Sequence, residues 1–186
     1  MDSAWAGLQR VLEGLTENEY HWLPSPDALT IDVLLPPDEE EDPDAYWGRM
    51  PSPYPSSTIE YKAAHVATCK IMYVEYAFRE GRLRWRRSDW NVPRTLAAMH
   101  PYLEHAHATL RSVLERLVDS DLTVMRKTNW GEFWPTERIL WAMITHDIYH
   151  GAQIRTIRTF YRAAARASQR GRETPRLGEP HGNSTG

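Results

Sequence analysis

Apolar residues recur at intervals of three and four positions along four segments of the chain, the spacing of helices that bury one face. In residues 3–15 the apolar positions are Trp5, Leu8, Leu12 and Leu15. The other three segments are residues 57–80, 94–118 and 135–167. No segment shows a convincing alternation of apolar and polar residues, the pattern typical of a strand. The chain is therefore predicted to be all-α.

Polar residues at the segment boundaries predict where these helices begin. Ser57, with Glu60 three residues later, has the capping-box pattern and is expected to be the N-cap of the second helix. Thr16 and Glu19 repeat this pattern and predict a short extra turn after the first helix. Pro101 either kinks the third helix or marks its true start.

Residues 24–55 differ from the rest of the chain. They contain eight of its thirteen prolines and the acidic run "DEEEDPD" at 38–44. Proline at this density excludes a long helix or a central strand, so an extended surface segment is expected. The apolar stretch "LTIDVLL" at 29–35 is expected to pack on the domain, and the acidic run to form a solvated loop.

Four amphipathic helices of this length predict an antiparallel four-helix bundle with a long Pro-rich acidic insertion between its first two helices. Residues 1–168 are expected to form this single domain, of which 24–55 is the extended insertion. The polar stretch at 169–186, rich in Gly and Pro, is predicted to be a disordered tail.

Composition and charge exclude several classes of function. A formal charge of −3 and a pI near 6.2 argue against a nucleic-acid binder, which needs a basic face. No run approaches the roughly 18 apolar residues of a membrane span, and the N-terminus lacks the pattern of a secretory signal. The single cysteine, Cys69, cannot form an internal disulfide. A cytoplasmic location is therefore the simplest expectation.

Two histidines lie one turn apart on the inward stripe of the last predicted helix. His146 and His150 occupy positions i and i+4 in "THDIYHGAQI", where both rings can reach one metal ion. Because unpaired buried imidazoles are costly, they need partners, and hydrogen bonds would serve as well as a metal. His65 also points inward, from the second helix, so the three histidines predict a facial metal site with open positions.

Other groups near these stripes have alternative roles. His107 falls on the inward face of the third helix and is either a supporting partner of the site, a core histidine or a fourth ligand. His100 faces the same way. Cys69, one turn after His65, is either a small buried residue or a thiolate ligand. The carboxylates that stand beside the stripes and can orient imidazoles are those of Glu104 and Asp147.

The histidine pattern resembles that of the DinB/YfiT-like metalloenzymes. That family has one histidine in its second helix and "H-x-x-x-H-R-G-Q" in a late helix. Here "TIEYKAAHVATCKIMYVEYAF" carries His65, and "TERILWAMITHDIYHGAQIRTIRTF" carries His146 and His150. "VLEGLTENEYHWLP" is similar to the family's first helix and turn, so the resemblance covers most of residues 3–165.

The resemblance implies a four-helix bundle with a three-histidine metal site and a homodimeric assembly. It implies zinc, nickel or another divalent ion, and relatives that use low-molecular-weight thiols as transferases or isomerases. A related domain contributes three histidines to an iron site. The sequence departs from the pattern where "HGAQ" replaces "HRGQ", which removes a basic group at position 151, and where the insertion is longer.

Two functions of different classes are consistent with these features. The first is a metal-dependent transferase that activates a low-molecular-weight thiol with His65, His146 and His150, or a hydrolase that activates water at the same site. Tyr149, His107, Trp130 and Trp134 are candidates for lining its small-molecule pocket. The second is a non-catalytic stress-related or partner-binding helical protein with a structural metal. A closed four-ligand site would favour the second.

Overall fold

The computed structural model describes residues 1–39, 46, 49–50 and 56–173, with side-chain surroundings up to residue 170. The α-helices among these residues are α1 (Asp2–Leu12), α2 (Glu17–Tyr20), α4 (Ile59–Phe78), α5 (Leu96–Leu114) and α6 (Thr136–Glu173). Three short 3-10 helices are η1 (Ile31–Val33), η2 (Arg87–Asp89) and η3 (Asp119–Thr123). Two strands, β1 (Met125–Lys127) and β2 (Phe133–Pro135), complete the elements. The protein is mostly helical, as predicted.

The ends of the first three predicted helices lie close to their expected places, with one correction. The N-cap of α4 is Thr58 and not Ser57, because the Thr58 hydroxyl accepts the hydrogen bond from Tyr61 N at 3.0 Å. Thr16 caps α2 as predicted and accepts from Glu19 N at 3.2 Å. The hydroxyl of Thr95 caps α5, so Pro101 lies inside that helix and does not start it.

The last helix and the region before it differ from the prediction. α6 extends to Glu173, past residue 169 where a tail was expected, while residues 174–186 lie outside the described part of the chain. The pairing of β1 with β2 is antiparallel, with Arg126 opposite Trp134, although the sequence showed no convincing strand pattern. Gly131 adopts a φ of +89° in the turn between them, a conformation that favours glycine.

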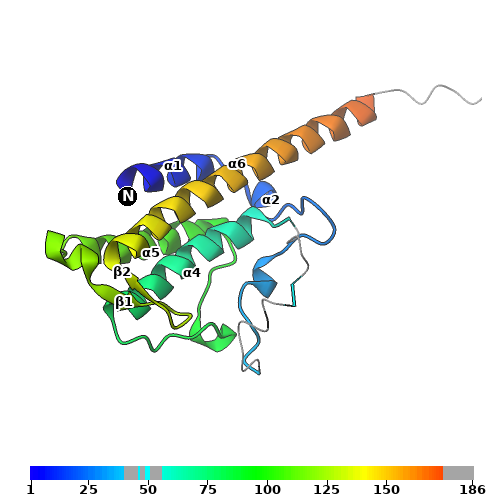
Figure 1. The fold of residues 1–186 in the computed structure, drawn as a ribbon. Helices are drawn as coiled ribbons and strands as arrows, with labels where there is room; N and C mark the ends of the chain where they lie inside the picture. Colours follow the sequence, from blue (N-terminus) through cyan, green and yellow to red (C-terminus); the bar gives the residue numbers. More distant parts are fainter. Residues whose placement is uncertain (40–45, 47–48, 51–55, 174–186) are drawn as a thin grey trace, which may run out of the picture.

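The helices pack around two apolar clusters (Figure 1). At one end Val74 packs with Leu110, Val113 and Met143, and these lie near the ends of α4 and α5 and the start of α6. α4 and α5 therefore run in the same direction, which differs from the antiparallel order expected of successive helices. The connection 79–95 returns along the length of the domain to make this possible. α6 runs opposite to α4.

Part of the Pro-rich segment packs on the helical domain. Ile31, Leu34 and Leu35 are buried in the larger cluster, as expected for the "LTIDVLL" stretch. Leu29 pairs with Ser57 in a parallel β-bridge, where Leu29 N donates to Ser56 O at 2.7 Å. Most of the acidic run and of the remaining insertion lies outside the described residues.

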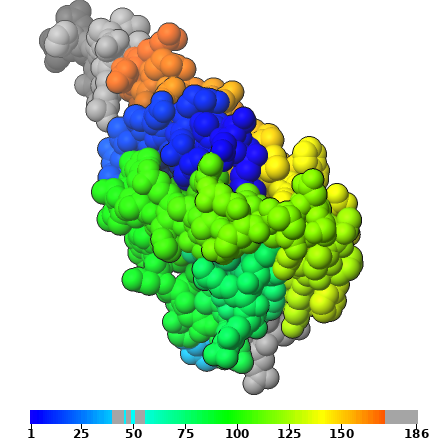
Figure 2. All heavy atoms as spheres, turned by 90° about the vertical axis from the view of Figure 1, so that its left-hand side faces the viewer, coloured from blue at the N-terminus to red at the C-terminus, as the bar shows by residue number. Residues whose placement is uncertain are grey.

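A buried ion pair fixes the end of α1 and the start of α2 against α6. The Arg158 guanidinium donates to the Glu19 carboxylate at 2.9 and 3.4 Å and to the carbonyls of Val11 and Glu13 at 2.6 and 2.9 Å. These carbonyls at the end of α1 have no partner within the helix, so Arg158 caps them from a neighbouring element. Figure 2 shows α1 (blue) on the surface, bordered by residues of α5 (green) and α6 (yellow).

None of the helices among the described residues has an apolar stretch long enough to cross a bilayer.

Candidate metal centre

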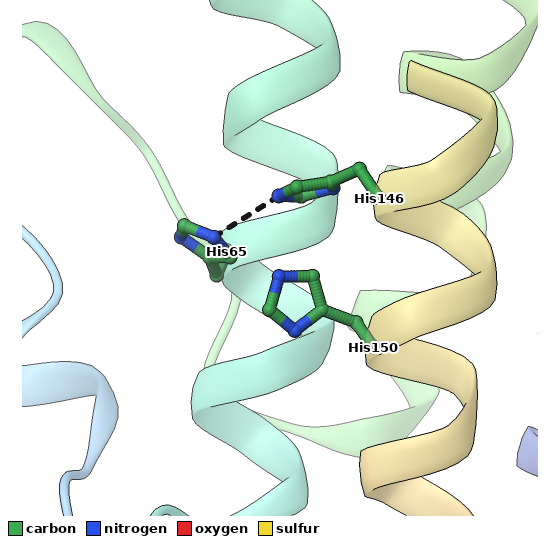
Figure 3. Close-up of side chains that lie close together, drawn as sticks. All are labelled: His65, His146 and His150. Carbon is green, nitrogen blue, oxygen red and sulfur yellow. Dashed lines mark hydrogen bonds between the residues drawn. The ribbon is translucent and has the colours of Figure 1, made fainter. Parts of the chain in front are cut away.

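Two antiparallel helices place the three predicted histidines together. His65 lies near the middle of α4, and His146 and His150 lie on successive turns of α6 that face it (Figure 3). One ring nitrogen of each lies within 4.8 Å of the others. The structure thus brings together the three residues that the sequence singled out.

The imidazoles converge on one point instead of stacking. Nε2 of His65 and Nε2 of His146 are 3.1 Å apart. The His150 ring is nearly perpendicular to both, with interplanar angles of 81° to His65 and 74° to His146. This arrangement directs nitrogens from three sides at a shared centre, as a facial set of ligands does.

Burial keeps these imidazoles uncharged, and neighbouring charges assist. Burial is the main cause that lowers the pKa of His65 to about 3, of His146 to about 2 and of His150 to about 4. A neutral imidazole is the form that binds a metal ion. The centre is therefore ready to bind a cation over the whole physiological pH range.

Gln153 orients His150. Its Oε1 lies 2.7 Å from Nδ1 of His150, so a proton on Nδ1 is held by the amide oxygen and the lone pair of Nε2 is left for a metal ion. Gln153 is the last residue of "HGAQ", the motif that the sequence carries at this point. This role was not predicted from the sequence, although Gln153 follows His150 by three residues and so lies on the same face of the helix.

Cys69 contacts the centre without joining it. Its sulfur lies 3.8 Å from both ring nitrogens of His65, but it is not part of the group of converging ligand atoms. Burial raises the pKa of the Cys69 thiol to about 12. The thiol is therefore protonated at neutral pH, which argues against the thiolate ligand among the two roles considered for it, and the residue is half-buried.

The groups proposed as supporting partners lie elsewhere. Asp147 forms a buried ion pair with Lys70, and it does not orient an imidazole. His107 stacks on Trp5, with ring centroids 4.3 Å apart, and is a core histidine. The remaining two, His100 and Glu104, line a separate cavity of about 250 Å³ between α1 and α5.

The aromatic candidates occupy two places. Tyr149 is 61% exposed and meets the His150 ring edge-on at a centroid distance of 5.1 Å, so it stands at the rim of the centre. Trp130 packs against Trp134 and against Tyr73, and Tyr73 lies two turns after His65 on α4. These rings form an aromatic wall along the same face of α4, toward the β-hairpin.

The departure at "HGAQ" does not alter the centre directly. Gly151 is buried, and a Cβ there would lie 3.8 Å from the Cα and Cδ1 of Leu8 on α1. The position therefore faces α1 instead of the imidazoles, and Ala152 is exposed. The expectation that a basic group was lost beside the imidazoles is corrected, because position 151 packs on α1, where an added Cβ would be in ordinary contact with Leu8.

The donor set fits a divalent transition-metal ion. Three neutral imidazoles suit zinc, nickel, copper and iron, and no carboxylate of the described residues joins the group. Without an ion, the close approach of His65 to His146 requires one ring to donate and the other to accept. Nδ1 of His146 is buried without a partner among the described residues.

The buried imidazoles predict that the metal-free protein loses stability in mild acid. In the unfolded chain they take up protons near the ordinary pKa of 6.5, whereas in the folded protein they stay neutral to about pH 4. Between these pH values the unfolded state binds more protons than the folded state. The free energy of unfolding is therefore highest above pH 6.5 and falls as the pH drops toward 4. Urea unfolding at pH 7 and pH 5 measures this.

A matched pair of variants isolates the effect. Changing His146 to Asn should reduce the difference between pH 7 and pH 5 by up to about 2 kcal/mol. Changing His105, which is exposed on α5, to Asn should leave it unchanged. An equal pH dependence in wild type and His146→Asn would contradict the burial argument.

One family matches the chain. A model described as the DinB superfamily matches residues 1–154, which include α1, α4, α5 and the part of α6 that carries His146 and His150. No curated protein and no solved structure matches. Since the match covers well over half of the sequence, the chain belongs to the DinB superfamily.

Proposed function

We propose that this protein is a metal-dependent enzyme that uses His65, His146 and His150 to hold a divalent ion, zinc or nickel before iron. We further propose that it transfers a low-molecular-weight thiol to an electrophilic acceptor. The observation that carries the proposal is the open ligand set: three imidazoles converge, and no fourth ligand atom of the described residues joins them. A structural zinc is normally closed by four protein ligands.

The chain's own groups support such a site. A divalent ion lowers the pKa of a bound thiol or water and so supplies a nucleophile near neutral pH. Gln153 fixes the orientation of His150. Cys69 is protonated and is not among the converging ligand atoms, so a thiolate at the centre would come from an external thiol. The aromatic wall of Tyr73, Trp130 and Trp134 offers an apolar surface for the acceptor.

Conjugation assays test the transferase proposal. Protein purified without a tag and reconstituted with Zn²⁺ or Ni²⁺ is incubated with physiological thiols and a chromogenic aryl halide. We expect at least one thiol to react roughly tenfold or more faster than with metal-free protein, because a larger fraction of it is thiolate. His146→Ala should lose this gain.

The outcomes separate the alternatives. Absence of metal-dependent conjugation with every thiol would overturn the transferase proposal. Turnover of ester or amide substrates by the same loaded protein would then indicate a hydrolase. If neither reaction occurs and the metal raises the melting temperature, the metal is structural and the protein is a non-catalytic binding module.

A further inference from the structure

We propose that Lys62 is the anion-recognition residue of the metal centre, and that the substrate carries a carboxylate or another anionic group beside its metal-binding atom. This inference deepens the proposed function and rests on it. It assigns a substrate class, and it assigns a role to a residue outside the histidine motif.

Lys62 lies on the face of α4 that forms the centre. It precedes His65 by three residues, so its side chain starts one turn away on the same stripe. The Tyr61 ring links the two residues: it stacks on the His65 ring with centroids 6.1 Å apart, and the Lys62 ammonium lies 5.4 Å from the centroid of the Tyr61 ring. Because α4 and α6 are antiparallel, Lys62 stands at the Gln153 end of the site, opposite the end with Cys69 and the aromatic wall.

The ammonium has no counter-ion among the described residues. Its one described partner is the ring of Tyr61, whose centroid is 5.4 Å from Nζ. The two fully buried cations of the described residues have carboxylates: Lys70 pairs with Asp147, and Arg158 with Glu19. Lys62 is half-buried, and burial lowers its pKa. A cation in this position is missing an anionic partner.

A divalent ion at the imidazoles makes this arrangement more unfavourable. The ion and the ammonium repel each other, and the three neutral ligands supply no negative charge to offset either. A ligand that binds the ion through one donor and Lys62 through an anionic group offsets both the repulsion and the missing charge partner of the ammonium. A thiol of the same size without that anionic group brings the charge of its sulfur to the ion, but it leaves Lys62 without a charge partner.

Cobalt-substituted protein and a pair of small thiols test the proposal. The probes are 3-mercaptopropionate, which carries a carboxylate, and 2-mercaptoethanol, which is neutral. Their dissociation constants are read from the sulfur-to-cobalt absorption band in the near ultraviolet. We expect wild type to bind the anionic thiol roughly tenfold or more tightly than the neutral one. Lys62→Met should reduce this ratio about tenfold, whereas Lys62→Arg should keep it.

Lys127 provides the matched control. It is exposed on β1 and, like Lys62, its ammonium stands over a tyrosine ring, with Nζ 5.9 Å from the Tyr76 centroid. Lys127→Met changes the net charge by the same amount and should leave the ratio unchanged. Retained Co²⁺ binding by Lys62→Met, tighter than in wild type because a repulsive charge is gone, shows that the variant folds and keeps its site.

Each remaining result is decisive. An unchanged ratio in Lys62→Met would overturn the role of Lys62 and leave thiol transfer standing. If no thiol alters the cobalt spectrum, thiol transfer fails. The same variants are then compared with acetohydroxamate and succinic monohydroxamate, which bind metals through oxygen. A preference for the anionic hydroxamate that depends on Lys62 supports the proposal, and equal binding overturns it. Failure to bind Co²⁺ at all overturns both.

Discussion

Replacing His65, His146 or His150 by alanine is expected to remove the divalent metal from the purified protein. The three rings place one nitrogen each within 4.8 Å of the others, and no other described group joins them. With one ligand gone, the remaining two nitrogens cannot define a facial site. Since disturbing groups behind metal ligands already lowers affinity 10–100-fold, loss of a ligand should lower it roughly a hundredfold or more.

Metal analysis of protein purified without an affinity tag gives the direct measurement. Wild type should contain close to one equivalent of a divalent metal, and each alanine variant should contain much less. His105→Ala is the control, because His105 is an exposed histidine of α5. Undiminished metal in His146→Ala and His150→Ala, as in His105→Ala, would refute the ligand assignment.

Removal of the Gln153 side chain should also lower the metal content of the purified protein, but by less than removal of a histidine. Gln153 holds Nδ1 of His150 but does not itself point a ligand atom at the centre. Loss of the Gln153 side chain should therefore lower the metal affinity by less than loss of a histidine ligand does.

The sequence predicted the helices and the histidine cluster because both depend on local periodicity. Positions i and i+4 on one helix, and one inward position on a second, are enough to bring His65, His146 and His150 together. Periodicity shows which way a side chain points, but not what it meets. His107 has the same inward pattern, and its ring meets Trp5 instead of the other imidazoles.

The features that were missed depend on long-range contacts or on very short segments. Three-residue strands such as β1 and β2 are too short to show an alternation. The common direction of α4 and α5 depends on the path of residues 79–95, which carries no periodic signal. Lys70 was also missed, because a lysine in a helical pattern is normally assigned to the surface.

Lys70→Met is expected to lower the free energy of unfolding by about 3–5 kcal/mol. The Lys70 and Asp147 side chains are 1% and 0% exposed, and they form an ion pair between α4 and α6. Oδ2 of Asp147 is buried without a partner among the described residues. Removal of the ammonium would leave that carboxylate without any counter-charge, and an unpaired buried charge is strongly unfavourable.

Thermal and urea unfolding measure this effect in the metal-free protein. A loss of this size should lower the melting temperature by roughly 10 °C for a chain of this length. The exposed pair of Arg82 and Glu80, with side chains 82% and 65% exposed, supplies the control. Because exposed ion pairs contribute little, Glu80→Gln should change stability by less than about 1 kcal/mol. A similarly small change in Lys70→Met would contradict the argument.

The double variant Lys70→Met, Asp147→Leu separates the value of the pair from the damage of breaking it. Burial lowers the pKa of Lys70 and raises the pKa of Asp147, and in both cases burial outweighs the attraction of the partner. Both shifts oppose the charged forms, so the ion pair is held together at a net desolvation penalty. The double variant should therefore recover wild-type stability or exceed it. A double variant as unstable as Lys70→Met would show instead that the pair itself stabilises the contact between α4 and α6.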